Sequence, residues 1–296
     1  MRISMRMSRS ARLCLTGFAA GVTATVVICA SAVAADPFER VKKKTPGATQ
    51  VGGTEGSKDA NKEEQPHPLA KALALARESQ QALREVKDYK ATFTKTELVK
   101  RKYFSHEMQM KFRNEPFSVY LKFQKAHPGR EVLYVAGQNK GKLLAHEPSG
   151  LASIVGTLDL LPTSSQAMSE GRHPITEIGM HKMLDSVIRQ WEEETKYDEI
   201  QVDLYPEAKL KTPSGERNCT AVLSQHPRPR EEFKFHQTIL YVDKETKFPI
   251  HLEQKGFPTQ ADAEPPIIER YSYTNIDVNV GFTDQDFSPK NKQYKF

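Results

Sequence analysis

Cysteine is scarce in this sequence of 296 residues, which contains three. Cys14 and Cys29 lie in an apolar leader over residues 1–35, so Cys219 is the one cysteine in the rest of the sequence. A lone cysteine forms no intrachain disulfide, and 38% hydrophobic residues are enough for an ordinary globular core without one. Because Cys219 stands in a strand-like run, we expect a buried thiol there, with a reactive thiol as the alternative.

Net charge is also low once the leader is set aside. The whole chain carries +6, from 43 Lys and Arg against 37 Asp and Glu. Four of the arginines and none of the acidic residues lie in residues 1–35, which leaves 39 basic against 37 acidic residues, a net charge of +2. Nucleic-acid binding requires a clustered basic face, so we expect no nucleic-acid partner.

Catalytic motifs are absent: there is no G-x-S-x-G, no H-E-x-x-H and no ordered Ser-His-Asp set. Residues 137–142 are one residue short of a phosphate loop and lack its Ser or Thr, so a hairpin turn is expected there. His173, Glu177 and His181 are spaced by four and would share one face of a helix, as in a metal site. Pro174 and Gly179 interrupt that helix, which favours a surface histidine and a capping carboxylate. We therefore predict a protein that is not an enzyme, with no catalytic residue, no metal and no cofactor.

Long hydrophobic runs are confined to the N-terminus. Four arginines precede a mostly apolar run over residues 13–33, and Ala32-Val33-Ala34 supplies small residues at a cleavage site. This pattern predicts a secretory signal peptide over residues 1–35. A retained membrane anchor is the alternative, because the run approaches spanning length. With cleavage, we expect a periplasmic or otherwise exported protein that is not an integral membrane protein.

Three further segments follow the leader. Residues 36–67 are rich in Lys, Glu, Gly, Pro and Thr and nearly devoid of large apolar side chains, which predicts a disordered polar linker. Residues 68–288 carry the periodic patterns of a folded antiparallel-sheet domain. Residues 289–296 are expected to be a C-terminal tail.

The stretch from Phe112 to His146 has the pattern of an antiparallel meander. Three turns rich in Pro, Gly and Asn divide it into short runs. In one run, Phe117, Val119, Leu121 and Phe123 alternate with Ser, Tyr and Lys, which predicts a strand with a single buried face. Strands joined by such short links must pair antiparallel.

Two stretches have a helical period, one opened by Pro68 and one over residues 180–194. Strands are predicted between the first helix and the meander, and again over 200–205, 217–225, 233–243, 248–255 and 268–279. Residues 147–172 are apolar without a clear period, as in a lid or a set of short helices. The order of helix, strands, helix, strands indicates an α+β fold, one large antiparallel sheet with helices packed on one face.

Large flexible hydrophobic side chains gather on the strands beside that apolar loop. Methionine-rich surfaces adapt to irregular partners such as acyl chains, although an ordinary core is the alternative. The candidate ligand-binding residues are Phe93, Met108, Met110, Phe112, Val119, Leu121 and Leu133 on strands, and Met183, Val187 and Trp191 on the second helix.

Four stretches carry a resemblance: PFSVYLKF, GREVLYVAGQNKGKLLAH, GRHPITEIGM and GFTDQDFSPKNKQYKF. They resemble exported bacterial proteins of the domain-of-unknown-function family fifteen seventy-one, over about Pro68 to Phe296. More distantly, the plan is similar to the LolA/LolB and LppX group of envelope lipid and lipoprotein carriers. That resemblance implies a curved sheet, a half-open barrel with an apolar concave face covered by helices and loops. It transfers neither an activity nor a cargo.

Together these patterns predict an exported, non-catalytic protein that holds a lipid, an acyl chain or another apolar ligand in the concavity of its sheet. The alternative is an envelope protein–protein interaction module without a ligand cavity, which docks a partner protein through a sheet edge or a helix. A metal-dependent hydrolase built on His173, Glu177 and His181 is the third hypothesis.

Overall fold

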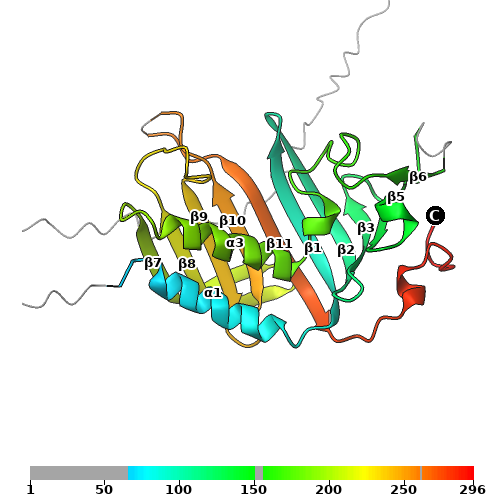
Figure 1. Cartoon of the computed structure of the whole chain (residues 1–296), viewed down its shortest axis with the longest axis horizontal. Helices are drawn as coiled ribbons and strands as arrows, with labels where there is room; N and C mark the ends of the chain where they lie inside the picture. The colour runs from blue at the N-terminus through cyan, green and yellow to red at the C-terminus, as the bar shows by residue number, and fades with distance from the viewer. Residues whose placement is uncertain (1–65, 151–155, 261) are drawn as a thin grey trace, which may run out of the picture. The chain divides into compact units, whose positions relative to one another are not determined.

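Within residues 66–150, 156–260 and 262–296, which the computed structural model describes, the fold is one sheet of eleven antiparallel strands with two α-helices on one face (Figure 1). The predicted signal peptide over residues 1–35 lies outside the described residues, and so does the predicted linker except for its last two residues. No helix in the described ranges is long and apolar enough to cross a membrane.

The first half of the sheet consists of β1 (Asp88–Val99), β2 (Lys102–Arg113), β3 (Ser118–Lys125), β4 (Glu131–Val135), β5 (Leu143–His146) and β6 (Thr157–Leu160). The second half consists of β7 (Gln201–Thr212), β8 (Gly215–Gln225), β9 (Gln237–Asp243), β10 (Pro249–Lys255) and β11 (Ile267–Val278). The α-helices are α1 (Ala70–Leu83) and α3 (Met180–Glu194), and the short 3₁₀ turns are η2 (Asn139–Gly141), η3 (Ile175–Glu177) and η4 (Asp284–Phe287).

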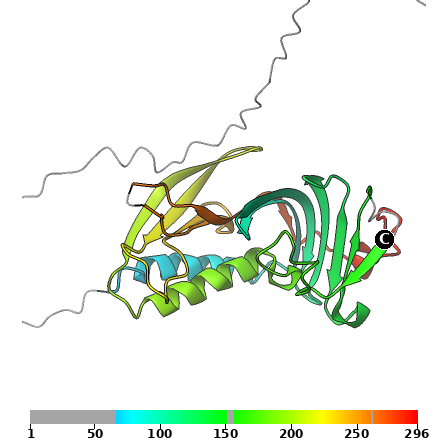
Figure 2. The ribbon, with the colours of Figure 1, turned by 90° about the horizontal axis from the view of Figure 1, so that it is seen from above.

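The strand order is β6-β5-β4-β3-β2-β1-β11-β10-β9-β8-β7, with every neighbouring pair antiparallel. Each half is a meander, and the first and last strands of the chain meet at the centre as β1 and β11. Register shifts interrupt several ladders, and such bulges bend the strands that carry them. Figure 2 shows the resulting curvature over β1–β6. The predicted α+β fold, with one antiparallel sheet and helices on one face, is confirmed.

Three strands differ from their predictions, and one of them, predicted over residues 233–243, begins only at Gln237 as β9. The segment that lacked a clear period contains β6, a strand of four residues at one end of the sheet, which is too short for its alternation to be recognised. The strand predicted over residues 200–205 extends to Thr212 as β7, past Pro206. Proline gives no N–H to a ladder, but here it lies at a bulge on the strand that ends the sheet, where it is tolerated.

The two helices lie side by side on the face of the sheet that carries the main core (Figure 2). Helix α3 has the predicted bounds, and its apolar stripe, Met180, Met183, Leu184, Val187, Ile188 and Trp191, is buried. Helix α1 begins at Ala70, two residues after Pro68. Hydrogen bonds from Arg77 and Gln80 to acidic side chains of α3 join the outer surfaces of the helices.

The opposite face of β3 and β4 is covered by the C-terminal segment, residues 280–296. Phe287 and Tyr294 form a second apolar cluster there with Tyr120 and Leu133. The prediction of a single buried face on β3 is therefore wrong, because Tyr120 on the other face is only 4% exposed. The residues expected to form a tail include Tyr294, which packs against this sheet.

Gly179 allows α3 to begin directly over the sheet. Its φ of +115° lies in a region that other residues rarely adopt, and a Cβ placed there would lie 2.6 Å from the ring of Phe112. We expect Gly179→Ala to lower the free energy of unfolding by about 2–3 kcal/mol, through backbone strain and overpacking.

Gly137→Ala is the matched control, measured by urea denaturation in the same buffer. Gly137 also has a positive φ, but its added Cβ meets nothing within 4 Å, so strain alone predicts a loss of about 1 kcal/mol. Equal losses in the two variants would show that the contact with Phe112 does not determine where α3 begins.

Cys219 lies on β8 and is fully buried. Burial, followed by the nearby charge of Asp243, raises the pKa of its thiol to about 11. The predicted buried thiol is confirmed.

Candidate functional site

A cavity of about 900 Å³ lies between the inner face of the sheet, the first turns of α3 and the segment that leads into η3. This volume falls within the ~300–1,000 Å³ that is usual for small-molecule pockets. Its apolar lining includes Phe93, Met108, Leu121, Val132, Leu252 and Val187. The cavity therefore has the volume of a small-molecule pocket and a large apolar region in its wall.

The inward-facing side chains of the central strands change from apolar to charged along the strand direction. The first row is Phe93, Met108 and Tyr273, the next is Lys95, His106 and Tyr271, and the last contains Glu97 and Glu269. All eight line the cavity. Because residues two apart on a strand share a face, the strand register alone creates a cavity with one apolar end and one charged end.

Glu97 is the most buried carboxylate at the charged end, with 2% of its surface exposed. It accepts hydrogen bonds from Lys95 Nζ at 2.9 Å, from the Tyr271 hydroxyl at 2.5 Å and from the Arg172 backbone N–H at 3.0 Å. Burial alone would raise the pKa of Glu97, but the Lys95 charge and these bonds outweigh it and lower that pKa. Glu97 is thus a buried anion whose partners are all in place.

Glu269, the second buried carboxylate, binds the segment that follows Glu170. Its Oε2 lies 2.8 Å from Arg172 Nε and 3.0 Å from His173 Nε2. The hydrogen bond to Glu269 raises the pKa of His173, against the opposing effect of burial. Ion pairs to Glu269 on β11 and hydrogen bonds to Lys95 and Glu97 on β1 therefore hold residues 170–173 over the cavity.

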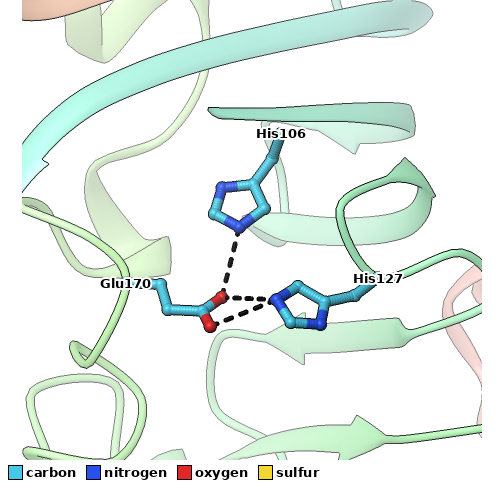
Figure 3. A group of neighbouring side chains, drawn as sticks. All are labelled: His106, His127 and Glu170. Atoms are coloured by element: carbon cyan, nitrogen blue, oxygen red, sulfur yellow. Dashed lines mark hydrogen bonds and ion pairs between the residues drawn. The ribbon is translucent and has the colours of Figure 1, made fainter. Parts of the chain in front are cut away.

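Glu170 joins two histidines, His106 on β2 and His127 in the turn after β3 (Figure 3). Its Oε2 lies 3.2 Å from His106 Nε2, 3.0 Å from His127 Nε2 and 3.0 Å from Arg130 Nη1. Burial, and then the charge of Lys95, lower the pKa of His106 to about 4. Burial alone would raise the pKa of Glu170, but Arg130 and the two histidines outweigh it and lower that pKa. The cluster thus joins a neutral buried imidazole to an ionised carboxylate at the wall of the cavity.

The structure brings together half of the predicted ligand-binding residues. Those that line the cavity are Phe93, Met108, Leu121, Met183 and Val187. The others, Met110, Phe112, Val119, Leu133 and Trp191, are buried in packing elsewhere.

Phe112 lies beneath the start of α3, where its ring stacks on Tyr89. The Met180 backbone N–H donates a hydrogen bond to the Tyr89 hydroxyl, at 3.1 Å, which fixes the start of α3 over this end of the strands. Met110 and Val119 belong to the same main core. The helix therefore fills the concavity at this end.

Leu133 and Trp191 are separated from the cavity for different reasons. Leu133 pairs with Tyr120 in the β3–β4 ladder, so it faces the C-terminal segment, whereas its neighbour Val132 pairs with Leu121 and lines the cavity. Trp191 lies near the other end of α3 and donates a hydrogen bond from Nε1 to Ser224 Oγ at 3.0 Å.

The three residues first weighed as a metal site do not converge. His173 Nδ1 contacts Glu177 at 3.2 Å, while its other nitrogen, Nε2, contacts Glu269 at 3.0 Å. His181 instead stacks on Phe112 and donates from Nε2 to the Leu83 carbonyl at 2.9 Å. Helix α3 begins only at Met180, so the three residues never share a helix face.

Sequence reasoning missed the cluster of His106, His127 and Glu170. These residues lie on a strand, in a hairpin turn and in a turn 43 residues further on, so no fixed spacing links them. The available signals were that His106 shares a strand face with Met108, and that His127 lies in the turn that follows the neighbouring strand.

Comparison with solved structures finds distant similarity to several proteins over most of the chain. The crystal structure of LprF from Mycobacterium bovis shares 10% identity at a TM-score of 0.41, over 73% of this chain and 97% of that one. LppX, a lipoprotein of Mycobacterium tuberculosis, shares 11% at 0.38, over 71% and 96%. A LolA superfamily protein of Nitrosomonas europaea shares 8% at 0.29, over 73% and 97%.

No curated protein matches this chain. A family model described as "Protein of unknown function (DUF1571)" matches residues 86–296, from two residues before β1 to the last residue of the sequence. This match includes every strand of the sheet, the helix α3 and the C-terminal segment. The chain belongs to the DUF1571 family.

Proposed function

We propose that this protein is an exported, non-catalytic binding protein that holds a lipid, an acyl chain or a similar apolar ligand in the cavity between the sheet and α3. The observation that carries the proposal is the cavity of about 900 Å³ with its apolar wall inside the curve of the sheet. Burial of apolar surface stabilises such a complex by about 25 cal/mol per Å², and few polar contacts are needed.

The charged end of the cavity indicates that the ligand has a polar group as well as an apolar part. A wholly apolar molecule would leave Lys95, His106 and Tyr271 facing its surface, whereas an amphiphile would place its polar group beside them. The apolar part would then contact Phe93 and Met108, one row along the same strands. We therefore propose an amphiphilic ligand, with its chain at the apolar end and its polar group at the charged end.

The test begins with native mass spectrometry and lipid extraction on protein purified from its own cells, followed by uptake of a fluorescent fatty acid. Leu121→Glu is expected to abolish uptake, because the carboxylate would have to be desolvated against the apolar part of the ligand. Gln124→Glu is the matched control, since Gln124 is an exposed residue of the same strand and uptake should be unchanged.

Folding of both variants is checked by circular dichroism and by the fluorescence of Trp191, the single tryptophan. Undiminished uptake by folded Leu121→Glu protein would contradict the assignment of the cavity. An apo mass together with no uptake by the native protein would contradict the proposed function itself.

A second candidate function is the binding of an envelope protein partner. Strand β7 forms one end of the sheet, and its Leu204 is 42% exposed. A partner strand that extends the sheet from β7 would bind through the backbone, as in other cases of strand addition. Isolation of a stable complex that a charged substitution at Leu204 dissociates would favour this candidate.

A further inference from the structure

We propose that His106, His127 and Glu170 bind one divalent transition-metal ion, with Zn²⁺ as the ion of best fit. In Figure 3 both imidazoles direct a nitrogen at the carboxylate that lies between them. The one ligand atom that each residue offers lies within 4.8 Å of the other two. This site does not depend on the proposed apolar ligand.

Two of the three distances among these atoms are close to those that a metal requires. Zinc binds imidazole nitrogen and carboxylate oxygen at about 2.0–2.2 Å, so two ligand atoms of a tetrahedral site are ~3.4 Å apart. Glu170 Oε2 lies 3.2 Å from His106 Nε2 and 3.0 Å from His127 Nε2. Small side-chain rotations would therefore open these two contacts around an ion and bring the two imidazoles closer together.

The chemistry of the three side chains selects the class of metal. Two imidazoles and one carboxylate suit Zn²⁺ and neighbouring first-row ions, whereas Mg²⁺ and Ca²⁺ prefer ligands that are all oxygen. A histidine binds metal only in its neutral form. His106 is only 2% exposed, so a bound ion would be shielded from water on this side.

The net charge around the three ligands also favours a cation. The group contains two cations, Lys95 and Arg130, and three carboxylates, Glu97, Glu147 and Glu170. It therefore carries one excess negative charge when its histidines are neutral. Arg130 occupies part of the position that an ion would take, but its Nε contacts Glu147 as well. Arg130 therefore keeps a carboxylate partner when Glu170 turns to a metal.

Metal binding would have a structural consequence for the cavity. Glu170 belongs to the segment that leads into η3, whereas His106 and His127 belong to the sheet and its turn. An ion held by all three would fasten that segment to the sheet. His106 and Glu170 both line the cavity, so the ion would lie at its wall.

The test is calorimetric titration of the full chain with ZnCl₂ after treatment with EDTA, with stoichiometry checked by elemental analysis. We expect one Zn²⁺ per chain with a micromolar or tighter dissociation constant. His127→Ala and Glu170→Gln are each expected to weaken binding by more than about tenfold, because each removes one of three ligands. His127 lies in a turn and Gln has the shape of Glu, so both variants should fold.

Two further variants separate a metal site from an ion-pair cluster. Arg130→Gln is expected to bind Zn²⁺ as tightly as the native chain or more tightly, because the competing cation is removed. His251→Gln removes an imidazole on another part of the sheet and should leave binding unchanged. Absence of stoichiometric binding, or binding that His127→Ala and Glu170→Gln do not weaken, would overturn the proposal.

Discussion

Tyr294→Ala is expected to lower the free energy of unfolding by about 3–4 kcal/mol, although the residue is the third from the C-terminus. Its ring stacks on Tyr120 with centroids 3.9 Å apart, and only 8% of its surface is exposed. Its hydroxyl donates a hydrogen bond to the Asp286 carbonyl at 2.5 Å. Truncation to alanine would remove the stacking and leave a cavity over β3.

The loss of packing should extend to the rest of the C-terminal segment. The Lys295 backbone N–H donates to Glu131 at 3.0 Å, and Phe287 packs in the same cluster. Without Tyr294, the outer face of β3 and β4 would be exposed to water. Urea denaturation followed by circular dichroism gives the free energy of unfolding. An unchanged slope of this free energy against urea concentration would confirm that only the stability has changed.

Tyr103→Ala is the control for this substitution. Tyr103 lies on β2 with 51% of its surface exposed, so its removal should change the free energy of unfolding by less than about 0.5 kcal/mol. If Tyr294→Ala were equally harmless, the C-terminal segment would contribute nothing to the sheet that it covers.

Acidification from about pH 7 to about pH 4 is expected to remove up to about 3 kcal/mol of stability through His251 alone. Burial lowers the pKa of His251 to about 4 from an ordinary value of 6.5, with Glu253 acting against the shift and Arg270 with it. Ser272 Oγ lies 2.7 Å from its Nδ1, and the ring meets Tyr241 edge-on.

The direction of the effect follows from proton binding. Between pH 6.5 and 4 the unfolded chain binds the proton of His251 and the folded chain does not. Stability therefore rises with pH through this window; the contribution is complete above pH 6.5 and is lost as the pH falls towards 4. Carboxylates with lowered pKa values, such as Glu253, begin to add their own loss when the pH falls to their ordinary value of 4.5, at the acidic end of this window.

His251→Gln isolates this contribution. Urea denaturation of both proteins across the window, with EDTA present, should show a smaller loss of stability in the variant on acidification. Parallel pH profiles for the native protein and the variant would mean that His251 titrates alike in the folded and unfolded chains.

The local periods of the sequence determined the elements of this fold. Apolar residues at a spacing of three and four predicted the bounds of α3. The helix can begin at Met180 because Gly179 permits the backbone turn that precedes it. Alternation along β3 placed Leu121 on the inner face, where it lines the cavity. Short Pro- and Gly-bearing turns required antiparallel pairing, which the sheet confirms.

Tertiary structure alone decided which buried residues surround a cavity and which fill the core. Val132 and Leu133 are both apolar because β4 is covered on both faces, so no pattern in the sequence shows which of them faces inward. The answer depends on a register set by the neighbouring strand and on a C-terminal segment that arrives more than a hundred residues later. Likewise, His106, His127 and Glu170 meet only because the sheet curves and the segment after β6 returns over it. Local propensity carries no information about contacts between such distant segments, and here those contacts create the candidate site.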